Sequence, residues 1–268
     1  MFMSTWEDFE IDCTKYLNNT FGTKATFIHQ GGTDSTVPDI LVKTKNNTSF
    51  YIEAKLCPAQ CGQFVLLPNI STRTFEYSTK NINNFNIYAE AIIEQMNKEF
   101  DEFREAGTSG KEIIMPNGAD IFTKWIIQSY KEKKAQFIIT NNYTILPIED
   151  FSKYFYVTAC YRIKRSGSGN VGKSRMNLVK QKIKTLDYTI ESTRTNDEKL
   201  FVTSFENIHN QRFILQQYEY MFSSRGKEYE VRKLSNTYNA NVIFSINLKT
   251  TTPGLSDFEF ESYLQLFK

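Results

Sequence analysis

Two short apolar segments separated by a polar turn constrain the fold of this chain more than any other feature. The apolar segments are residues 37–42 and 49–55, and residues 43–48 between them are polar and include two adjacent Asn residues. This pattern predicts a β-hairpin. In an antiparallel hairpin, the residue that begins one strand lies near the residue that ends the other. The hairpin is therefore expected to bring Asp39 and Glu53 side by side at one end of a sheet.

The expected pair of carboxylates indicates a metal site. Two neighbouring carboxylates repel each other unless a cation lies between them, and Mg²⁺ takes oxygen ligands from carboxylates, carbonyls and water. We therefore expect Asp39, Glu53 and the carbonyl of Ala54 to bind Mg²⁺. Lys55 lies two residues after Glu53, so the period of a strand places both side chains on the same face. There the Lys55 ammonium can contact a substrate phosphate or help to deprotonate an attacking water.

The residues of the hairpin resemble a known active site. Pro38-Asp39 followed by Glu53-Ala54-Lys55 resembles the motif of the PD-(D/E)XK nuclease superfamily, whose metal-dependent site is built on such a hairpin. Residues 60–64 resemble the Gln-bearing segment that follows the Lys in many members, notably type II restriction endonucleases, which suggests Gln63 as a DNA contact. The resemblance covers about a quarter of the chain.

The resemblance implies Mg²⁺-dependent, sequence-specific cleavage of double-stranded DNA. A homodimer is expected, because one active site cuts one strand and two-fold symmetry is the common way to cut both. Three alternatives stay open for the motif: a repair nuclease or junction resolvase that recognises DNA shape, a DNA-binding protein without catalysis, and an ordinary hairpin whose charges pair on a solvated face.

An acidic helix is predicted before the hairpin. Apolar residues recur at helical spacing through residues 6–17, and Ser4 is a suitable N-cap for a helix over residues 4–19. Members of the superfamily often contribute a Glu from such a helix to the metal site, and Glu10 resembles that position better than Glu7. The alternative is that both acids solvate and cap the helix.

Hydrophobic patterning predicts an α/β protein with a mixed central sheet flanked by helices, and the resemblance implies that this is a restriction-endonuclease-like core. We expect a nuclease core with a helical insertion over residues 1–148, and a basic, β-rich region over residues 149–268 that contributes DNA contacts, without a linker between them. This second region is either separate or part of the same domain. Helices are expected over residues 78–105, as one helix or a pair, and 119–134. Further strands are expected over residues 26–30, 64–67, 135–140, 143–146, 154–163, 199–204, 213–220, 229–234 and 241–248.

Charge and composition narrow the function further. Residues 1–40 contain six acids against two Lys, whereas residues 151–200 contain eleven Lys or Arg against four acids, a contrast that fits a metal site in one region and a polyanion in the other. The lack of a long apolar run or a basic signal segment predicts a cytoplasmic protein. The chain contains four Cys and two His residues, which do not offer a suitable set of zinc ligands. We therefore interpret the Cys residues as free thiols.

Residues Gly167–Ser174 match the P-loop pattern, in which backbone amides surround phosphates and Lys and Ser hold phosphate and Mg²⁺. A P-loop follows a buried parallel strand, whereas the segment before Gly167 is a charged edge, so we expect no nucleotide cofactor. We expect the turn to contact DNA phosphates instead. A P-loop NTPase that uses Gly167–Ser174 and a solvated basic loop without a partner are the alternatives. The proposed contacts are Arg162, Lys164, Arg165, Ser166, Ser168, Lys173 and Arg175.

Overall fold

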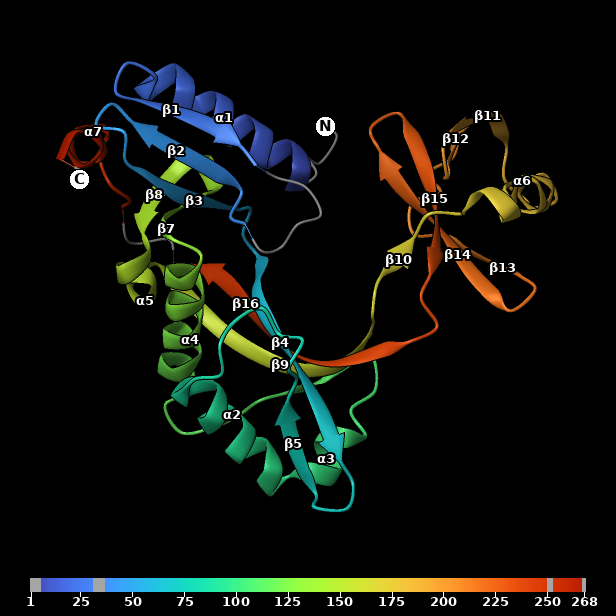
Figure 1. Cartoon of the computed structure of the whole chain (residues 1–268), viewed down its shortest axis with the longest axis horizontal. Helices are drawn as coiled ribbons and strands as arrows, with labels where there is room; N and C mark the ends of the chain where they lie inside the picture. The colour runs from blue at the N-terminus through green and yellow to red at the C-terminus, as the bar shows by residue number, and fades with distance from the viewer. Residues whose placement is uncertain (1–5, 31–36, 250–252, 267–268) are drawn as a thin grey trace. The chain divides into compact units, whose positions relative to one another are not determined.

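The computed structural model describes residues 6–30, 37–249 and 253–266 (Figure 1). The chain forms two compact units, unit 1 (Met1–Arg162 and Ala240–Lys268) and unit 2 (Ile163–Asn239). The expected N-cap Ser4 and the side chain of Glu7 lie outside the part of the chain that the structure describes. None of the described helices is long and apolar enough to cross a membrane.

The first sheet of unit 1 carries the predicted hairpin. Its strand order is β1-β2-β3-β7-β8, and β3 and β7 are parallel while all other neighbours are antiparallel. The turn of the hairpin places Asn47 at φ 58°, a left-handed conformation that Asn tolerates. The strands are β1 (Ala25–His29), β2 (Ile40–Thr44), β3 (Ser49–Lys55), β7 (Ala135–Thr140) and β8 (Thr144–Pro147).

One face of the first sheet packs against helices α1 (Trp6–Phe21) and α7 (Asp257–Leu266), blue and red in Figure 1. Phe50, Ile52 and Ala54 alternate along β3 and are buried in this layer. Because side chains alternate across a strand, Glu53 and Lys55 point to the opposite face. The packing that forms the core thereby fixes the direction of the two charged side chains.

The second sheet of unit 1 has the strand order β5-β4-β16-β9-β6. Helices α2 (Ile87–Lys98), α3 (Phe100–Arg104), α4 (Gly118–Glu132) and α5 (Phe151–Tyr154) share its core, in which Trp125 of α4 stacks on Phe244 at 4.4 Å between ring centroids. Asn86 caps α2 by accepting from two backbone N–H groups, so this helix begins at Ile87. The helix predicted over residues 78–105 is thus a pair, α2 and α3. The strands are β4 (Ala59–Asn69), β5 (Thr74–Tyr77), β6 (Lys111–Glu112), β9 (Phe155–Arg165) and β16 (Tyr238–Leu248).

Unit 2 is built on an antiparallel sheet of order β11-β12-β15-β14-β13, with β10 paired to β15. Helix α6 (Met176–Ile183) packs on it through Val179 and Ile183. The predicted strand of residues 213–220 is a hairpin, which turns at Gln216 with φ 57°. The strands are β10 (Ser168–Gly169), β11 (Ile190–Asn196), β12 (Lys199–Ser204), β13 (Arg212–Leu215), β14 (Tyr218–Arg225) and β15 (Glu228–Leu234).

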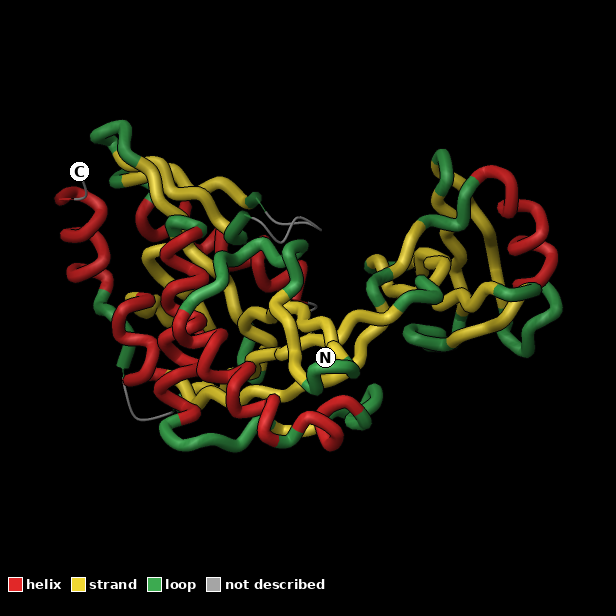
Figure 2. The backbone as a smooth tube through the Cα atoms, turned by 60° about the horizontal axis from the view of Figure 1, so that its bottom comes forward, coloured by secondary structure: helices red, strands yellow, loops and turns green. Residues whose placement is uncertain are grey.

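The division into units differs from the boundary expected near Ile148. Most of β9 and β16 lies in unit 1, where both belong to the second sheet, so the chain leaves this unit after Arg162 and returns to it at Ala240 (Figure 2). Hydrogen bonding between distant strands sets this division, and sequence composition along the chain does not reveal it. The mixed sheet flanked by helices and the β-rich region that follows agree with the predicted class.

Candidate active site

Backbone pairing of the hairpin positions Asp39 directly before β2. The backbone N–H of Gln30 donates to the Asp39 carbonyl at 2.7 Å, and the N–H of Ala54 donates to Asp39 Oδ2 at 2.9 Å. The Asp39 carboxylate is thus fixed to β3, the strand that carries Glu53 and Lys55. The hairpin register, in which Ile40 pairs with Ile52, explains why the two acids meet.

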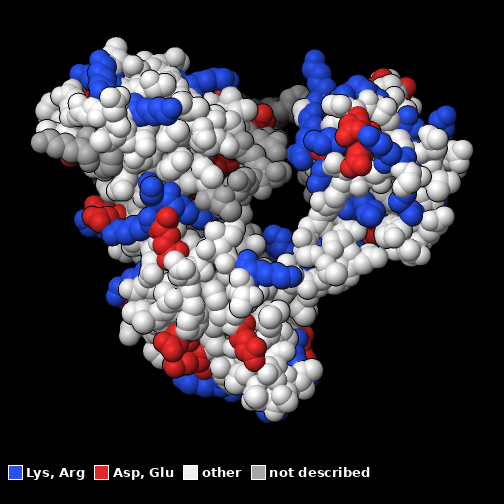
Figure 3. Space-filling view, in the orientation of Figure 1, with Lys and Arg blue, Asp and Glu red and all other residues white. Residues whose placement is uncertain are grey.

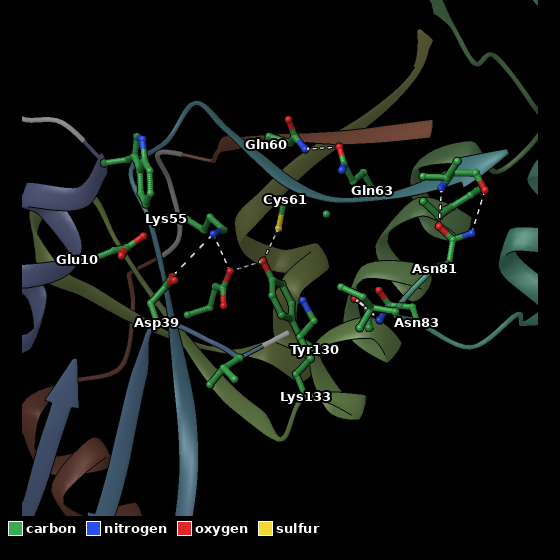
Figure 4. A pocket seen from close by; sticks show the side chains of 18 of the residues that line it. Glu10, Asp39, Lys55, Gln60, Cys61, Gln63, Asn81, Asn83, Tyr130 and Lys133 are labelled. Atoms are coloured by element: carbon green, nitrogen blue, oxygen red, sulfur yellow. Dashed lines mark hydrogen bonds and ion pairs between the residues drawn. The ribbon is translucent and has the colours of Figure 1, made fainter. Parts of the chain in front are cut away.

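Lys55 lies between the two carboxylates (Figure 4). Its Nζ is 2.6 Å from Glu53 Oε1 and 3.9 Å from Asp39 Oδ2. All three side chains are largely shielded, with exposed fractions of 18% for Lys55, 16% for Asp39 and 13% for Glu53. The structure therefore brings together the three residues that the sequence places at the reaction centre.

The charges of this cluster are not balanced. Burial and the nearby Glu53 carboxylate raise the pKa of Asp39 to about 7, although Lys55 and the Ala54 N–H act in the opposite direction. Burial lowers the pKa of Lys55, but Glu53 and Asp39 outweigh it and hold that pKa above its ordinary value. The site thus has more negative charge than its one Lys offsets, a condition that an added cation relieves.

Tyr130 of α4 reaches the same carboxylate from the other side. Its hydroxyl lies 3.5 Å from Glu53 Oε1, at the limit of hydrogen-bonding distance, and 3.0 Å from Cys61 Sγ. Burial raises the pKa of Tyr130 well above its ordinary value and that of Cys61 to about 12, so both groups stay protonated at neutral pH. Both can donate to a carboxylate or a phosphate oxygen.

Glu10 of α1 lies at the edge of this cluster and faces His29 of β1. The distance from His29 Nε2 to Glu10 Oε2 is 3.3 Å, and the Glu10 side chain is only 7% exposed. The negative charge of Glu10 also helps to raise the pKa of Asp39, after the larger effects of burial and Glu53. Glu10 therefore interacts with the hairpin acids electrostatically, as a supporting residue would.

A cavity of about 420 Å³ opens over the cluster. Gln60 and Gln63 of β4 lie on its wall, and Gln60 Nε2 donates to Gln63 Oε1 at 3.1 Å (Figure 4). The side chains that line it are those of Trp6, Glu10, Val37, Asp39, Glu53, Lys55, Gln60, Cys61, Gln63, Phe64, Val65, Lys80, Asn81, Ile82, Asn83, Ser129, Tyr130 and Lys133, together with Gly62. The predicted catalytic and amide-bearing residues of unit 1 thus share one space.

The donor set of the cavity fits a hard divalent ion. Among the described residues, no three His, Cys, Asp or Glu side chains gather in a way that could hold a metal. A zinc site needs three or four such ligands, whereas Mg²⁺ binds through one or two carboxylates and completes its shell with water and substrate oxygens. Asp39 and Glu53, with the negative charge excess described above, meet the second requirement.

The basic turn of unit 2 is tied into its own fold. Arg165 pairs with Glu219, Lys173 Nζ lies 2.9 Å from Asp197 Oδ1, and the guanidinium group of Arg175 donates to the Tyr220 hydroxyl and to Gln216 Oε1. The remaining residues divide between two settings. Ser166 and Ser168 bond to Ser235 and to Arg232 within unit 2, and Lys164 is exposed on the part of β9 that belongs to this unit. Arg162 belongs to unit 1.

Unit 2 as a whole is basic. It contains fourteen Lys or Arg against eight Asp or Glu, and basic side chains are dense on the face of this unit that Figure 3 shows. The P-loop-like residues Gly167–Ser174 include β10, which pairs antiparallel with β15, and they do not follow a buried parallel strand. This geometry differs from the parallel strand and helix between which a P-loop is held.

Sequence reasoning missed several residues around the candidate reaction centre. Tyr130 fits the apolar stripe of α4 and His29 fits the end of β1, so each is indistinguishable from a core residue in the pattern. Thr140 ends a predicted strand and Asn141 follows it, but neither residue belongs to a recognisable motif. The parallel pairing of β3 with β7, which brings these two residues to the end of β3, is the missing information.

Comparisons with known proteins identify the family. No family model matches the chain, and no curated protein sequence matches it. Among solved structures, the chain is similar to that of the HhaI endonuclease in complex with DNA, with 39% sequence identity and a TM-score of 0.80. The match covers 98% of this chain and 100% of the other, and it confirms the predicted restriction-endonuclease-like fold. The chain therefore belongs to the family of the HhaI endonuclease, a type II restriction endonuclease.

Proposed function

We propose that this chain is a Mg²⁺-dependent, sequence-specific endonuclease of the PD-(D/E)XK superfamily that hydrolyses phosphodiester bonds in double-stranded DNA. The observation that carries the proposal is the convergence of Asp39, Glu53 and Lys55 in one cavity. The likeness to the HhaI endonuclease supports DNA cleavage as the activity. The spacing and hairpin geometry of the three residues support the superfamily.

The metal site is proposed at Asp39, Glu53 and the carbonyl of Ala54. A Mg²⁺ ion held there would supply positive charge beside the phosphate and would lower the pKa of a bound water. The Ala54 N–H donates to Asp39 Oδ2 at 2.9 Å, and this hydrogen bond orients the Asp39 carboxylate without the help of an ion. The site is thus preorganised by the hairpin backbone, which reduces the reorganisation needed during the reaction.

Lys55 is proposed to act as a cation and hydrogen-bond donor. Its pKa is held above the ordinary value by Glu53 and Asp39 in the ion-free site, so it is an ammonium at neutral pH. An ammonium cannot accept a proton, and the geometry therefore supports orientation of the attacking water and stabilisation of charge on the phosphate oxygens. Of the two roles that the sequence allowed for Lys55, contact with the phosphate is therefore favoured over deprotonation of the water.

Glu10 is proposed to support the metal site without binding the ion directly. It lines the same cavity and interacts with Asp39 through its charge, while His29 holds its Oε2 at 3.3 Å. Partners that orient metal ligands typically tune affinity and activity by 10–100-fold. Glu10→Gln is therefore expected to lower cleavage less than Asp39→Asn does.

DNA contacts are proposed at two places. The amides of Gln60 and Gln63 lie in the cavity beside the reaction centre, where amide groups can bond to base edges. The basic turn of unit 2 is proposed to contact phosphates, which positions the duplex without reading its sequence. Arg165 and Arg175 are oriented by internal partners, whereas Lys173 forms an exposed pair with Asp197 and can exchange it for a phosphate.

The expected homodimer is a proposal with its own test. The described part of the chain contains one cluster of this kind, and one such site cuts one strand in each encounter with DNA. Two chains on a symmetric site would cut both strands together. Sedimentation with and without DNA distinguishes the states, and accumulation of nicked plasmid would show that a single chain cuts the strands one after the other.

Digestion of a plasmid with Mg²⁺, against a control with EDTA, tests the proposed function. A sequence-specific endonuclease gives discrete fragments whose ends map to one short sequence. A smear would indicate a nuclease without sequence preference, and cuts confined to branched or distorted DNA would indicate a repair nuclease or a resolvase. DNA binding without any cut would place the chain among non-catalytic binding proteins.

A further inference from the structure

The exit from the catalytic strand β3 is held by the end of its parallel neighbour β7. After Lys55 the chain passes through Cys57 and enters β4 at Ala59. Thr140, the last residue of β7, is the register partner of Lys55, and Asn141 follows it. Neither residue lines the described cavity, so an effect of either one on the reaction must pass through the backbone that it holds.

Thr140 bonds directly to the backbone of Lys55. Its Oγ1 donates to the Lys55 carbonyl at 2.6 Å, and the Thr140 residue is completely buried. Because the Thr140 hydroxyl is buried, water cannot take the place of this hydrogen bond unless the structure opens locally. This bond therefore fixes the peptide that follows Lys55, and with it the base of the Lys55 side chain.

Asn141 bonds to both backbone groups of Cys57, two residues after Lys55. The N–H of Cys57 donates to Asn141 Oδ1 at 2.7 Å, and Asn141 Nδ2 donates to the Cys57 carbonyl at 2.9 Å. This pair of opposed bonds imitates a neighbouring strand at a point where β3 has ended. Gln60 and Gln63 follow a few residues later on β4. Asn141 thereby holds the short segment between β3, which carries Lys55, and β4, which carries Gln60 and Gln63.

We propose that Thr140 and Asn141 are positioning residues that fix Lys55 and the beginning of β4 relative to the scissile phosphate. This inference rests on the proposed function. The Lys55 side chain has four flexible carbons, so the position of its ammonium depends on a fixed backbone as well as on Glu53. A displacement of about 1 Å at a reacting group can lower a rate by about 10²-fold.

The test separates positioning from DNA binding and from stability. Thr140→Val removes the hydroxyl and keeps the shape, whereas Thr140→Ser keeps the hydroxyl. Thr44→Val is the matched control, because Thr44 is also buried and its Oγ1 bonds to Thr48 at the far end of the same hairpin. The measurements are kcat and KM on DNA that carries the cleaved sequence, DNA affinity in EDTA by fluorescence anisotropy, and Tm.

We expect Thr140→Val to lower kcat by at least about tenfold, in the range typical of residues that orient catalytic groups, with KM and DNA affinity unchanged. Thr140→Ser and Thr44→Val should keep the wild-type kcat. A wild-type kcat in Thr140→Val, or an equal loss in Thr140→Ser, would overturn the inference. If Thr140→Val does not fold, Asn141→Ala replaces it and must show the same loss. A wild-type chain that does not cleave DNA would overturn the proposed function, and this inference with it.

Discussion

At the scale of single residues, the proposed reaction centre holds two carboxylates and one ammonium in a shielded space. Asp39, Glu53 and Lys55 could be predicted from the sequence, because the alternation of two strands decides which residues share a face. Tyr130 and His29 could not be predicted, because each fits the pattern of a core residue. Their roles depend on contacts with carboxylates that are distant in sequence, Glu53 for Tyr130 and Glu10 for His29.

The raised pKa of Asp39 gives the stability a defined pH dependence. The pKa of this carboxyl is about 7 in the folded chain against an ordinary value of 3.8, so between these pH values the folded state binds the proton more tightly than the unfolded chain does. Stability from this group therefore falls as pH rises from about 4 to 7. Asp39→Asn removes that loss and should raise Tm relative to wild type at pH 8, but not at pH 4, when both are measured in EDTA.

Asp187→Asn is the control for this prediction, because Asp187 is exposed and lies in unit 2. Its Tm difference from wild type should be the same at both pH values. Parallel Tm profiles for Asp39→Asn and wild type between pH 4 and 8 would mean that Asp39 titrates as an ordinary carboxyl. The crowding of the two acids would then be weaker than their geometry indicates.

At the scale of elements, the strands with clear alternation could be predicted and the exposed ones could not. The hairpin and β7 follow from their apolar residues, and β12 does as well. β11 was missed because almost every one of its residues is exposed, which leaves no apolar period to detect. Residues 213–220 were read as one strand because the turn at Gln216 contains neither Gly nor Pro.

The approach of α4 to β4 explains one glycine of the Gln-bearing segment. Gly62 has φ +106°, and a Cβ added there would lie 2.9 Å from the Trp125 ring. Gly62→Ala should therefore destabilise the fold by about 1–3 kcal/mol and displace Gln60 and Gln63, which lowers cleavage at the preferred sequence. Gly169→Ala is the control, because a Cβ there meets open space. Equal Tm values for both variants would show that β4 accommodates the side chain.

At the scale of the whole molecule, the chain inserts unit 2 between two strands of unit 1. Each unit has its own core, since the buried residues of unit 2 form a cluster separate from the two clusters of unit 1. The sequence shows the change to basic, β-rich composition but not the return of β16 to the second sheet, because that pairing joins residues far apart in the chain. The boundary expected near Ile148 therefore lies before β9, most of which belongs to unit 1, whereas unit 2 begins at Ile163.

This insertion predicts that unit 1 folds without unit 2. The strand order places β9 beside β16, so a short Gly-Ser linker can replace residues 163–239. We expect the shortened chain to unfold cooperatively, and to bind DNA more weakly with a smaller salt dependence because it has lost a basic unit. Circular dichroism melting and anisotropy titrations against salt measure the two effects. An unchanged salt slope would show that unit 2 does not contact the DNA backbone.

The central claim is that the Lys55 cluster is the centre of Mg²⁺-dependent DNA cleavage. Its most direct test is the cleavage rate of plasmid DNA with Mg²⁺ for wild type and for Lys55→Ala, with Lys43→Ala, an exposed Lys near the turn of the same hairpin, as the control. We predict that Lys55→Ala lowers the rate by at least about 10²-fold while the chain stays folded and binds DNA, and that Lys43→Ala cuts like wild type. A Lys55→Ala chain that cuts the same sequence at the wild-type rate would contradict the account.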